Sequence, residues 1–142
     1  IGSTAYALIY GVGMLVSPIA GRIGDVFPRT QVAIATIFVC MIGFSILVFA
    51  GSPLLVVVGV VILATGMWGF PPAVQAVLLS EFPKNKMGAD LGGFKTIFTG
   101  IGAIGPAYVG FVADWSSYTI AYAGFLPGLF VSLLALGVLL WE

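Results

Sequence analysis

The sequence contains no histidine, and its single cysteine, Cys40, lies inside an apolar run. One cysteine excludes an intrachain disulfide. Without histidine, and with no pair of acidic residues inside the apolar segments, we find no combination of nucleophile and base that would support catalysis. We therefore expect no enzymatic activity, no cofactor and no metal site.

Charged residues are almost as scarce, since five basic and five acidic side chains make up 7% of the 142 residues. Soluble domains are about a quarter charged. Hydrophobic residues account for 61% of this chain, and its mean hydropathy is +1.20. Ten ionised side chains cannot cover a water-facing surface of this length, so the lipid bilayer is the expected environment. The formal net charge is zero, and we expect no nucleic-acid partner.

The apolar runs predict an all-α integral membrane protein with five transmembrane helices in one domain, residues 1–142. A helix needs about 20 apolar residues to cross the bilayer, and only helices or closed barrels satisfy their backbone groups in lipid. No alternation typical of strands is present. The expected spans are approximately 1–20, 31–50, 54–80, 87–113 and 119–140.

The first residues do not resemble a signal peptide. The chain begins with Ile1 inside an apolar run, without a charged segment or a small-residue cleavage site. We interpret the sequence as a piece of a longer polypeptide and expect further helices of that polypeptide among its partners.

The basic residues all fall on one side of the predicted topology. They lie in or beside the loops 21–30 and 81–88, whereas the other two connections contain no lysine or arginine; the five are Arg22, Arg29, Lys84, Lys86 and Lys95. The positive-inside rule therefore predicts a multi-pass protein of the cell membrane with these two loops in the cytoplasm, residue 1 outside and residue 142 in the cytoplasm.

Three segments resemble the major facilitator superfamily. The stretch GRIGDVFPRT resembles its signature loop, matching at Gly21, Asp25 and Arg29 and departing at Val26, Pro28 and Thr30. SEFPKNKMG resembles the loop before the fifth helix of a six-helix half, and GAIGPAYVGFVADW resembles that fifth helix. The resemblance implies the last five helices of one half in a six-plus-six bundle. We favour the C-terminal half, helices eight to twelve, over helices two to six of the N-terminal half.

Small residues follow one face of the predicted fourth span. They recur at intervals of three and four residues, and the series ends at an acidic residue. We call this set the small-residue stripe: Gly93, Thr96, Gly100, Ala103, Ala107, Gly110 and Asp114. Small residues let membrane helices approach closely, so the stripe predicts a protein neighbour. That contact is either static or one that separates during transport, and the resemblance favours the second reading. The same segment contains GIGAIG, but no strand precedes it, so it does not indicate a dinucleotide site.

Candidate substrate-binding residues lie on the third and first spans. Thr65, Trp68, Pro72 and Gln75 share one face of the third span, and Tyr10 lies on the first. Gln75 is a costly side chain to bury in lipid, so it either contacts a solute or bonds a neighbouring helix. The resemblance favours solute contact, because the corresponding helix of the family lines the central cavity.

The segment 21–30 suggests a conformational role. Gly21 would permit a tight exit from the first span, and Asp25 would accept hydrogen bonds from Arg22, Arg29 or a helix N-terminus of the other half. In the alternative reading, the two arginines only set orientation and touch anionic lipid.

Two functions follow from these features. The first is part of a secondary active transporter that moves a small solute by alternating access. The second is an integral membrane assembly subunit without transport activity.

Overall fold

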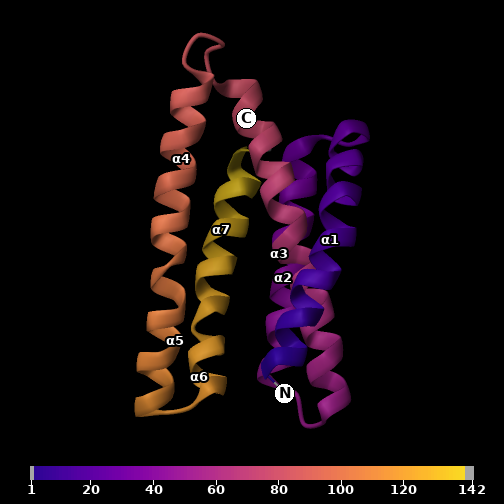
Figure 1. Cartoon of the computed structure of the whole chain (residues 1–142), viewed down its shortest axis with the longest axis vertical. Helices are drawn as coiled ribbons and strands as arrows, with labels where there is room; N and C mark the ends of the chain where they lie inside the picture. Colours follow the sequence, from indigo (N-terminus) through magenta and orange to yellow (C-terminus); the bar gives the residue numbers. More distant parts are fainter. Residues whose placement is uncertain (1, 140–142) are drawn as a thin grey trace.

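The chain folds into long helices joined by short turns, as the ribbon in Figure 1 shows. The computed structural model describes residues 2–139, so the expected positions of residues 1 and 142 lie outside the described residues. In chain order the helices are α1 (Gly2–Val26), α2 (Arg29–Val48), α3 (Pro53–Glu81), α4 (Met87–Gly102), α5 (Ile104–Trp115), α6 (Tyr118–Ala123) and α7 (Phe125–Leu139). Within residues 2–139, five spans are long and apolar enough to cross a membrane, two of them built from the pairs α4–α5 and α6–α7. The predicted all-helical membrane fold with five spans is confirmed.

The segment 21–30 is helical rather than a loop, which corrects the sequence-based expectation. Helix α1 continues through Gly21 and Asp25 to Val26, and α2 begins at Arg29. Only Phe27 and Pro28 interrupt the two helices. The charged side chains of this segment do not end the helix. Pro28 does, because it lacks an N–H group and disfavours helical backbone at the residue before it. The connection between α3 and α4 is likewise shorter than 81–88 and covers residues 82–86.

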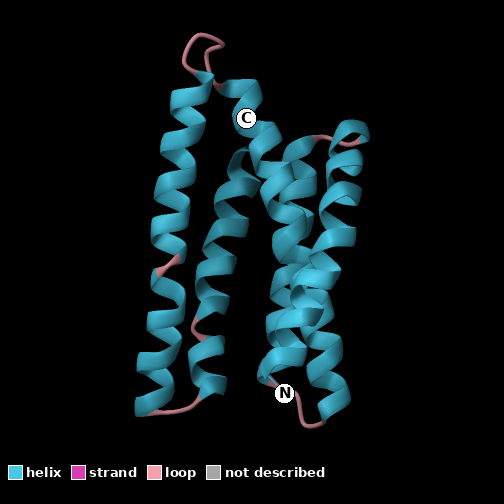
Figure 2. Cartoon of the chain, in the orientation of Figure 1, coloured by secondary structure: helices cyan, strands magenta, loops and turns pink. Residues whose placement is uncertain are grey.

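Both of the last two spans are interrupted near a proline, and Figure 2 shows each interruption as a short loop within the ribbon. Helix α4 gives way to α5 at Ala103, three residues before Pro106. Helix α6 gives way to α7 at Gly124, three residues before Pro127. A proline has no N–H to donate to the carbonyl four residues earlier, so the helix is weakened at that turn.

Serine side chains cap two of the helices. Ser52 accepts a hydrogen bond from the backbone N–H of Leu55 at 3.4 Å, and Pro53 follows in the first helical position of α3. Ser117 accepts from the N–H of Ile120 at 3.3 Å and begins α6. Each cap satisfies one of the backbone donors left free at a helix start, so both turns are fixed by local chemistry.

Helix α3 packs against both α1 and α2 and is the centre of the fold. Glycines allow α3 and α2 to meet closely. A Cβ atom on Gly66 would lie 2.6 Å from the backbone nitrogen of Cys40, and one on Gly43 would lie 2.5 Å from that of Leu63. Such close approach maximises van der Waals contact between membrane helices. The buried apolar residues are Ala20, Val32, Ala33, Ile37, Cys40, Val60, Ala64, Ala73 and Ala121.

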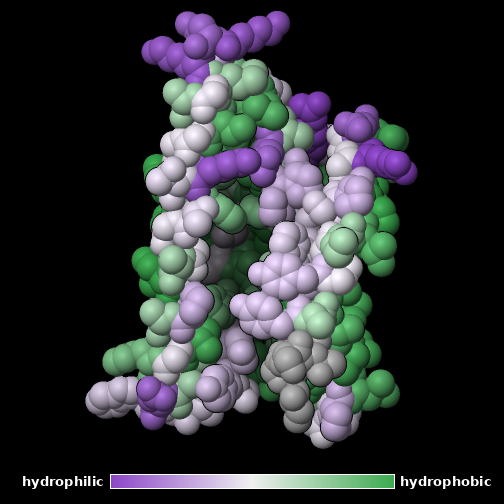
Figure 3. All heavy atoms as spheres, in the orientation of Figure 1, coloured by the Kyte–Doolittle hydropathy of each residue, from purple (hydrophilic) through white to green (hydrophobic). Residues whose placement is uncertain are grey.

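Helices α4 and α5 are the least covered part of the fold. Neither contains a buried residue. Within residues 2–139, the backbone of α4 approaches only that of its chain neighbours α3 and α5. The space-filling view in Figure 3 shows a hollow between the α4 side and the α1–α3 side, with most of the strongly hydrophilic residues toward one end of the molecule. One face of this chain is therefore open over most of its length.

The two charged connections lie at the same end of the bundle. Figure 1 shows the turn between α1 and α2 near the loop between α3 and α4, whereas the α2–α3 and α5–α6 turns lie at the opposite end. This arrangement follows from helices that cross the bilayer alternately in opposite directions.

Candidate functional site

Three aromatic side chains form a row that connects α1 with α3. Tyr6 stacks on Tyr10 with ring centroids 5.6 Å apart, and Tyr10 meets Trp68 at a centroid distance of 5.5 Å and an interplanar angle of 58°. Both tyrosines are mostly exposed within this chain. The row therefore presents aromatic faces and phenolic hydroxyls on an open surface, with Trp68 as its inner end.

The position of Trp68 depends on a glycine of the facing helix. A Cβ atom on Gly13 would lie 2.7 Å from three atoms of the indole ring, so the ring occupies the space that a side chain would fill. The indole Nε1 is buried and has no hydrogen-bond partner among the described residues. Leaving such a donor unpaired costs about 1–3 kcal/mol. It is therefore a group that another molecule or another helix could satisfy.

Beside Trp68 lies the central hollow, a cavity of about 490 Å³ between α2, α3, α4 and α7. This volume is within the range of about 300–1,000 Å³ usual for small-molecule sites. Its walls are the side chains of Ile37, Cys40, Phe44, Leu63, Met67, Trp68, Phe70, Pro71, Phe98, Leu129 and Ser132. Most of them lie near the middle of their helices, so the hollow lies at mid-height of the bundle.

The central hollow is apolar with few polar groups. None of its lining residues is charged. The Ser132 hydroxyl donates to the carbonyl oxygen of Gly128 at 2.9 Å and retains lone pairs for a further donor. Such walls suit an uncharged or largely apolar solute, because a buried ion would need a partner of opposite charge. Among residues 2–139, no group of His, Cys, Asp and Glu is placed to hold a metal ion.

The predicted substrate-binding residues are only partly brought together. Tyr10 and Trp68 are in contact, and Trp68 borders the central hollow. Thr65 borders a different groove, and its hydroxyl donates to the carbonyl of Val61 at 2.8 Å. Gln75 is half-buried and borders neither cavity.

Sequence reasoning missed Phe98 and Ser132, which reach the central hollow from α4 and α7. No local pattern singles out either residue, because the last span also carries hydroxyl groups at Tyr118, Thr119 and Tyr122.

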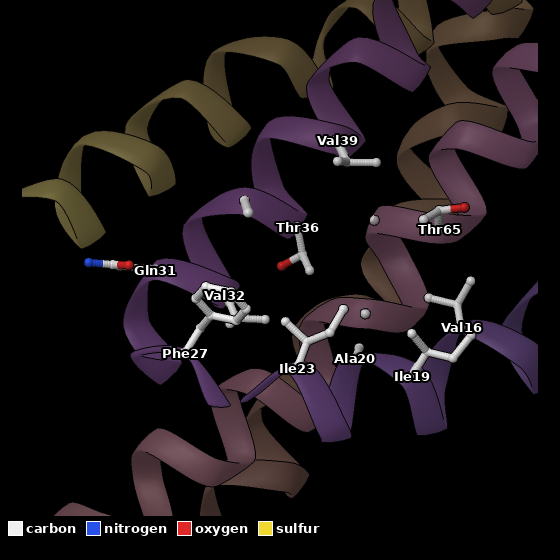
Figure 4. A pocket seen from close by; sticks show the side chains of 13 residues that line it. Val16, Ile19, Ala20, Ile23, Phe27, Gln31, Val32, Thr36, Val39 and Thr65 are labelled. Carbon is white, nitrogen blue, oxygen red and sulfur yellow. The ribbon is translucent and has the colours of Figure 1, made fainter. Parts of the chain in front are cut away.

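A second cavity, the α1–α2–α3 groove, has a volume of about 550 Å³. It lies toward the charged end of the bundle, between α1 and α2 and over α3. Figure 4 shows Ile19 and Ile23 of α1 facing the same space as Val32 and Thr36 of α2.

The charged residues of the first turn have different surroundings. Arg29 donates a hydrogen bond from Nη1 to the backbone carbonyl of Ala76 at 2.9 Å, which links the start of α2 to the last turns of α3. A cation near a helix C-terminus is favourable because the helix dipole is negative there. Arg22 and Asp25 lie on α1 and are exposed.

The small-residue stripe is open within this chain. A Cβ atom on Gly93, Gly100 or Gly110 would meet nothing within 4 Å. Ala103 and Ala107 are exposed, as is Asp114 at the end of the bundle opposite the charged turns. The described residues therefore supply no partner for this face.

Comparison with known families decides the identity of the fold. The sequence model described as the Major Facilitator Superfamily matches residues 1–142. The chain belongs to the major facilitator superfamily. No curated protein and no solved structure matches the sequence. Because the proteins of this superfamily are transporters rather than enzymes, the match supports a function of the transporter type for this chain.

Proposed function

We propose that this chain is part of a secondary active transporter of the superfamily that moves a small solute by alternating access. The observation that supports this most is the central hollow, a cavity at mid-height of the bundle beside the buried, unpartnered Nε1 of Trp68. Secondary transporters bind their solute near the bilayer midplane and expose it to one side at a time. Trp68 and Tyr10 would contact the solute, whereas Thr65 and Gln75, the other two residues predicted to bind it, do not border this hollow.

The five helices correspond, in this proposal, to helices eight to twelve of the C-terminal half. Further helices of the same polypeptide would cover the open face of α4 and α5 along the small-residue stripe. On that face Gly100 has open space beside it and Ala107 is exposed, within residues 2–139. Close contact there is favourable only when the two halves meet, so the contact would form and separate as the cavity opens and closes.

The charged end is proposed to face the cytoplasm, as the positive-inside rule predicts for residues 21–30 and 81–88. Asp25 would act there as a latch. Its proposed partners are Arg22, three residues earlier on the same helix, Arg29, which bonds Ala76 through Nη1 alone, and the positive N-terminus of a helix in the other half. A contact with the other half would exist only in the state closed to the cytoplasm and would favour that state.

The experiment is solute flux in proteoliposomes that contain the polypeptide at its natural length. A panel of labelled neutral and weakly charged small solutes is offered outside the vesicles, with and without proton or sodium gradients. The proposal expects saturable uptake of one solute class and its countertransport after preloading. Absence of saturable flux for every solute, in protein that remains folded, would favour an assembly subunit instead.

A further inference from the structure

The α1–α2–α3 groove has apolar walls and is separate from the central hollow. Ile19 and Ile23 of α1 and Phe27 of the following turn form one side, and Val32 and Val39 of α2 form the other. The first three residues are exposed to an extent of 54%, 43% and 58%, so no other part of the described chain covers them. An apolar groove of about 550 Å³ in a membrane protein is filled either by protein or by hydrocarbon.

The polar side chains of the groove need no polar occupant. Gln31 is exposed, and Figure 4 shows its amide pointing away from the other lining side chains. The Thr36 hydroxyl donates to the carbonyl of Ala33 at 2.7 Å, and the Thr65 hydroxyl donates to that of Val61 at 2.8 Å. Both donors are therefore satisfied within their own helices. A hydrocarbon chain would enter without leaving a buried donor unpaired.

The groove is unsuited to a further transmembrane helix. Membrane helices approach each other where small residues line the contact. Here the small floor residues Gly66 and Gly69 are already covered, because Cβ atoms on them would meet Cys40 and Thr36 at 2.6 and 2.8 Å. The rims are branched or aromatic side chains that would hold a helix backbone away, whereas a single acyl chain fits between them.

Positive charge dominates the end of the groove. From Val16 the groove follows α1 to its last residue, Val26, for about 15 Å at 1.5 Å per residue, and it ends at Phe27 in the turn between two spans. Arg22 lies beside the lining residue Ile23, and Arg29 follows the turn. Asp25 is two residues from Ile23 and projects from the opposite side of α1, and Arg22, three residues before Asp25, lies between that side and the groove. Arg29 bonds Ala76 through Nη1 and has further N–H groups to donate.

We infer that the α1–α2–α3 groove binds one acyl chain of an anionic phospholipid, whose phosphate is held by Arg22 and Arg29. The chain would lie between Ile19, Ile23 and Val39, with the headgroup at the level of the first turn. The site uses neither the central hollow nor the small-residue stripe, but it shares Arg22 with the proposed latch. Lipid binding is measured without solute flux, so the inference can fail while the proposed transport function stands.

The test is native mass spectrometry of the natural-length protein with phosphatidylglycerol and phosphatidylcholine of identical acyl chains. Retained phosphatidylglycerol is expected to exceed phosphatidylcholine by about fivefold for each participating arginine. Ala35→Phe fills the groove from α2 and should lower lipid retention by about tenfold through loss of buried apolar contact. Ala135→Phe, an equal change at an exposed position of α7 outside the groove, should leave it unchanged. Arg22→Gln should remove much of the preference for phosphatidylglycerol while phosphatidylcholine retention stays the same.

A second measurement keeps the inference testable if Ala35→Phe folds poorly. Ala35→Cys places a thiol in the groove, whereas the native Cys40 is buried. Added phosphatidylglycerol should slow maleimide labelling of Cys at position 35 more than phosphatidylcholine does. Equal retention of both lipids by the parent protein would overturn the inference. So would a thiol that is unreactive whatever the lipid, which would indicate a protein segment in the groove.

Discussion

Arg29 at the start of α2 donates a hydrogen bond to the carbonyl oxygen of Ala76 in α3, 47 positions later, at 2.9 Å. This bond joins the two most closely packed helices at the charged end of the bundle. It also explains how a cation is tolerated at a helix N-terminus, where the dipole of its own helix is unfavourable, because the guanidinium reaches the C-terminal turns of an antiparallel neighbour. Arg29 therefore has a structural role within this chain besides any part in a latch.

Removal of this bond should lower stability modestly. Arg29→Gln is expected to cost about 1 kcal/mol, the usual net value of one intramolecular hydrogen bond. The measurement is the thermal unfolding midpoint in lipid-free detergent. Arg22→Gln is the control, because Arg22 is exposed on α1 and its loss should leave the midpoint unchanged. Equal effects of the two substitutions would show that charge rather than the Ala76 contact is responsible.

The close contact of α2 and α3 predicts opposite effects for two glycines. Gly66→Ala should destabilise the fold by about 1–3 kcal/mol, because the new Cβ would lie 2.6 Å from backbone and side-chain atoms of Cys40. Gly21→Ala should be neutral or stabilise by up to about 1 kcal/mol, since Gly21 is helical and faces open space.

Chemical unfolding of both glycine variants measures these changes. A large loss of stability in Gly21→Ala would contradict the helical assignment and favour a tight turn at that residue. No glycine among the described residues has a positive φ, so no turn here depends on glycine for its backbone conformation.

The buried donor of Trp68 predicts an effect on solute binding. Trp68→Phe keeps an aromatic ring against Tyr10 and Gly13 but removes the Nε1 hydrogen. If the solute accepts this hydrogen bond, its apparent affinity should fall by about tenfold, equivalent to about 1.4 kcal/mol, while the amount of folded protein stays the same. The measurement is the half-saturation concentration of solute uptake.

Trp115→Phe is the matched control for this change, because Trp115 is 82% exposed at the far end of α5. Unchanged uptake together with reduced stability in Trp68→Phe would show that the donor bonds another helix rather than the solute.

The small-residue stripe predicts that bulk is tolerated on one side of α4 only. Gly100→Leu places a large side chain on the stripe, and Gly102→Leu places the same side chain on the opposite side of the helix. Both positions are open within this chain. We expect Gly100→Leu to abolish most solute flux and Gly102→Leu to retain it. Equal flux in the two variants would indicate that the stripe faces lipid.

Much of the fold could be predicted from the sequence, because length and composition alone identify membrane spans. The five spans were found in this way. The ends of the helices were harder to predict than the spans, because hydropathy marks only where the chain leaves the lipid. The α1 helix continues beyond that point and ends just before Pro28. The interruptions at Ala103 and Gly124 each lie three residues before a proline, Pro106 and Pro127, but hydropathy does not distinguish these prolines from the apolar runs around them.

The candidate site was less predictable than the fold. Tyr10 and Trp68 were selected separately from their helix faces, and their contact depends on α1 crossing α3 at Gly13. Helix periodicity tells which residues share a face but not which helices meet. Phe98 and Ser132 reach the central hollow only through the tertiary arrangement of α4 and α7, so no local pattern could have shown them.

The most direct test of alternating access uses thiols at the two ends of the small-residue stripe. Gly93→Cys lies toward the charged end and Gly110→Cys toward the other, and both positions face open space in this chain. Labelling by a membrane-impermeant thiol reagent from each side is compared in the parent and in Asp25→Asn, which keeps the shape of the side chain but removes its charge. The account predicts that loss of the latch increases labelling at position 93, decreases it at position 110 and slows flux. Labelling that changes in the same direction at both positions, or at neither, would contradict it.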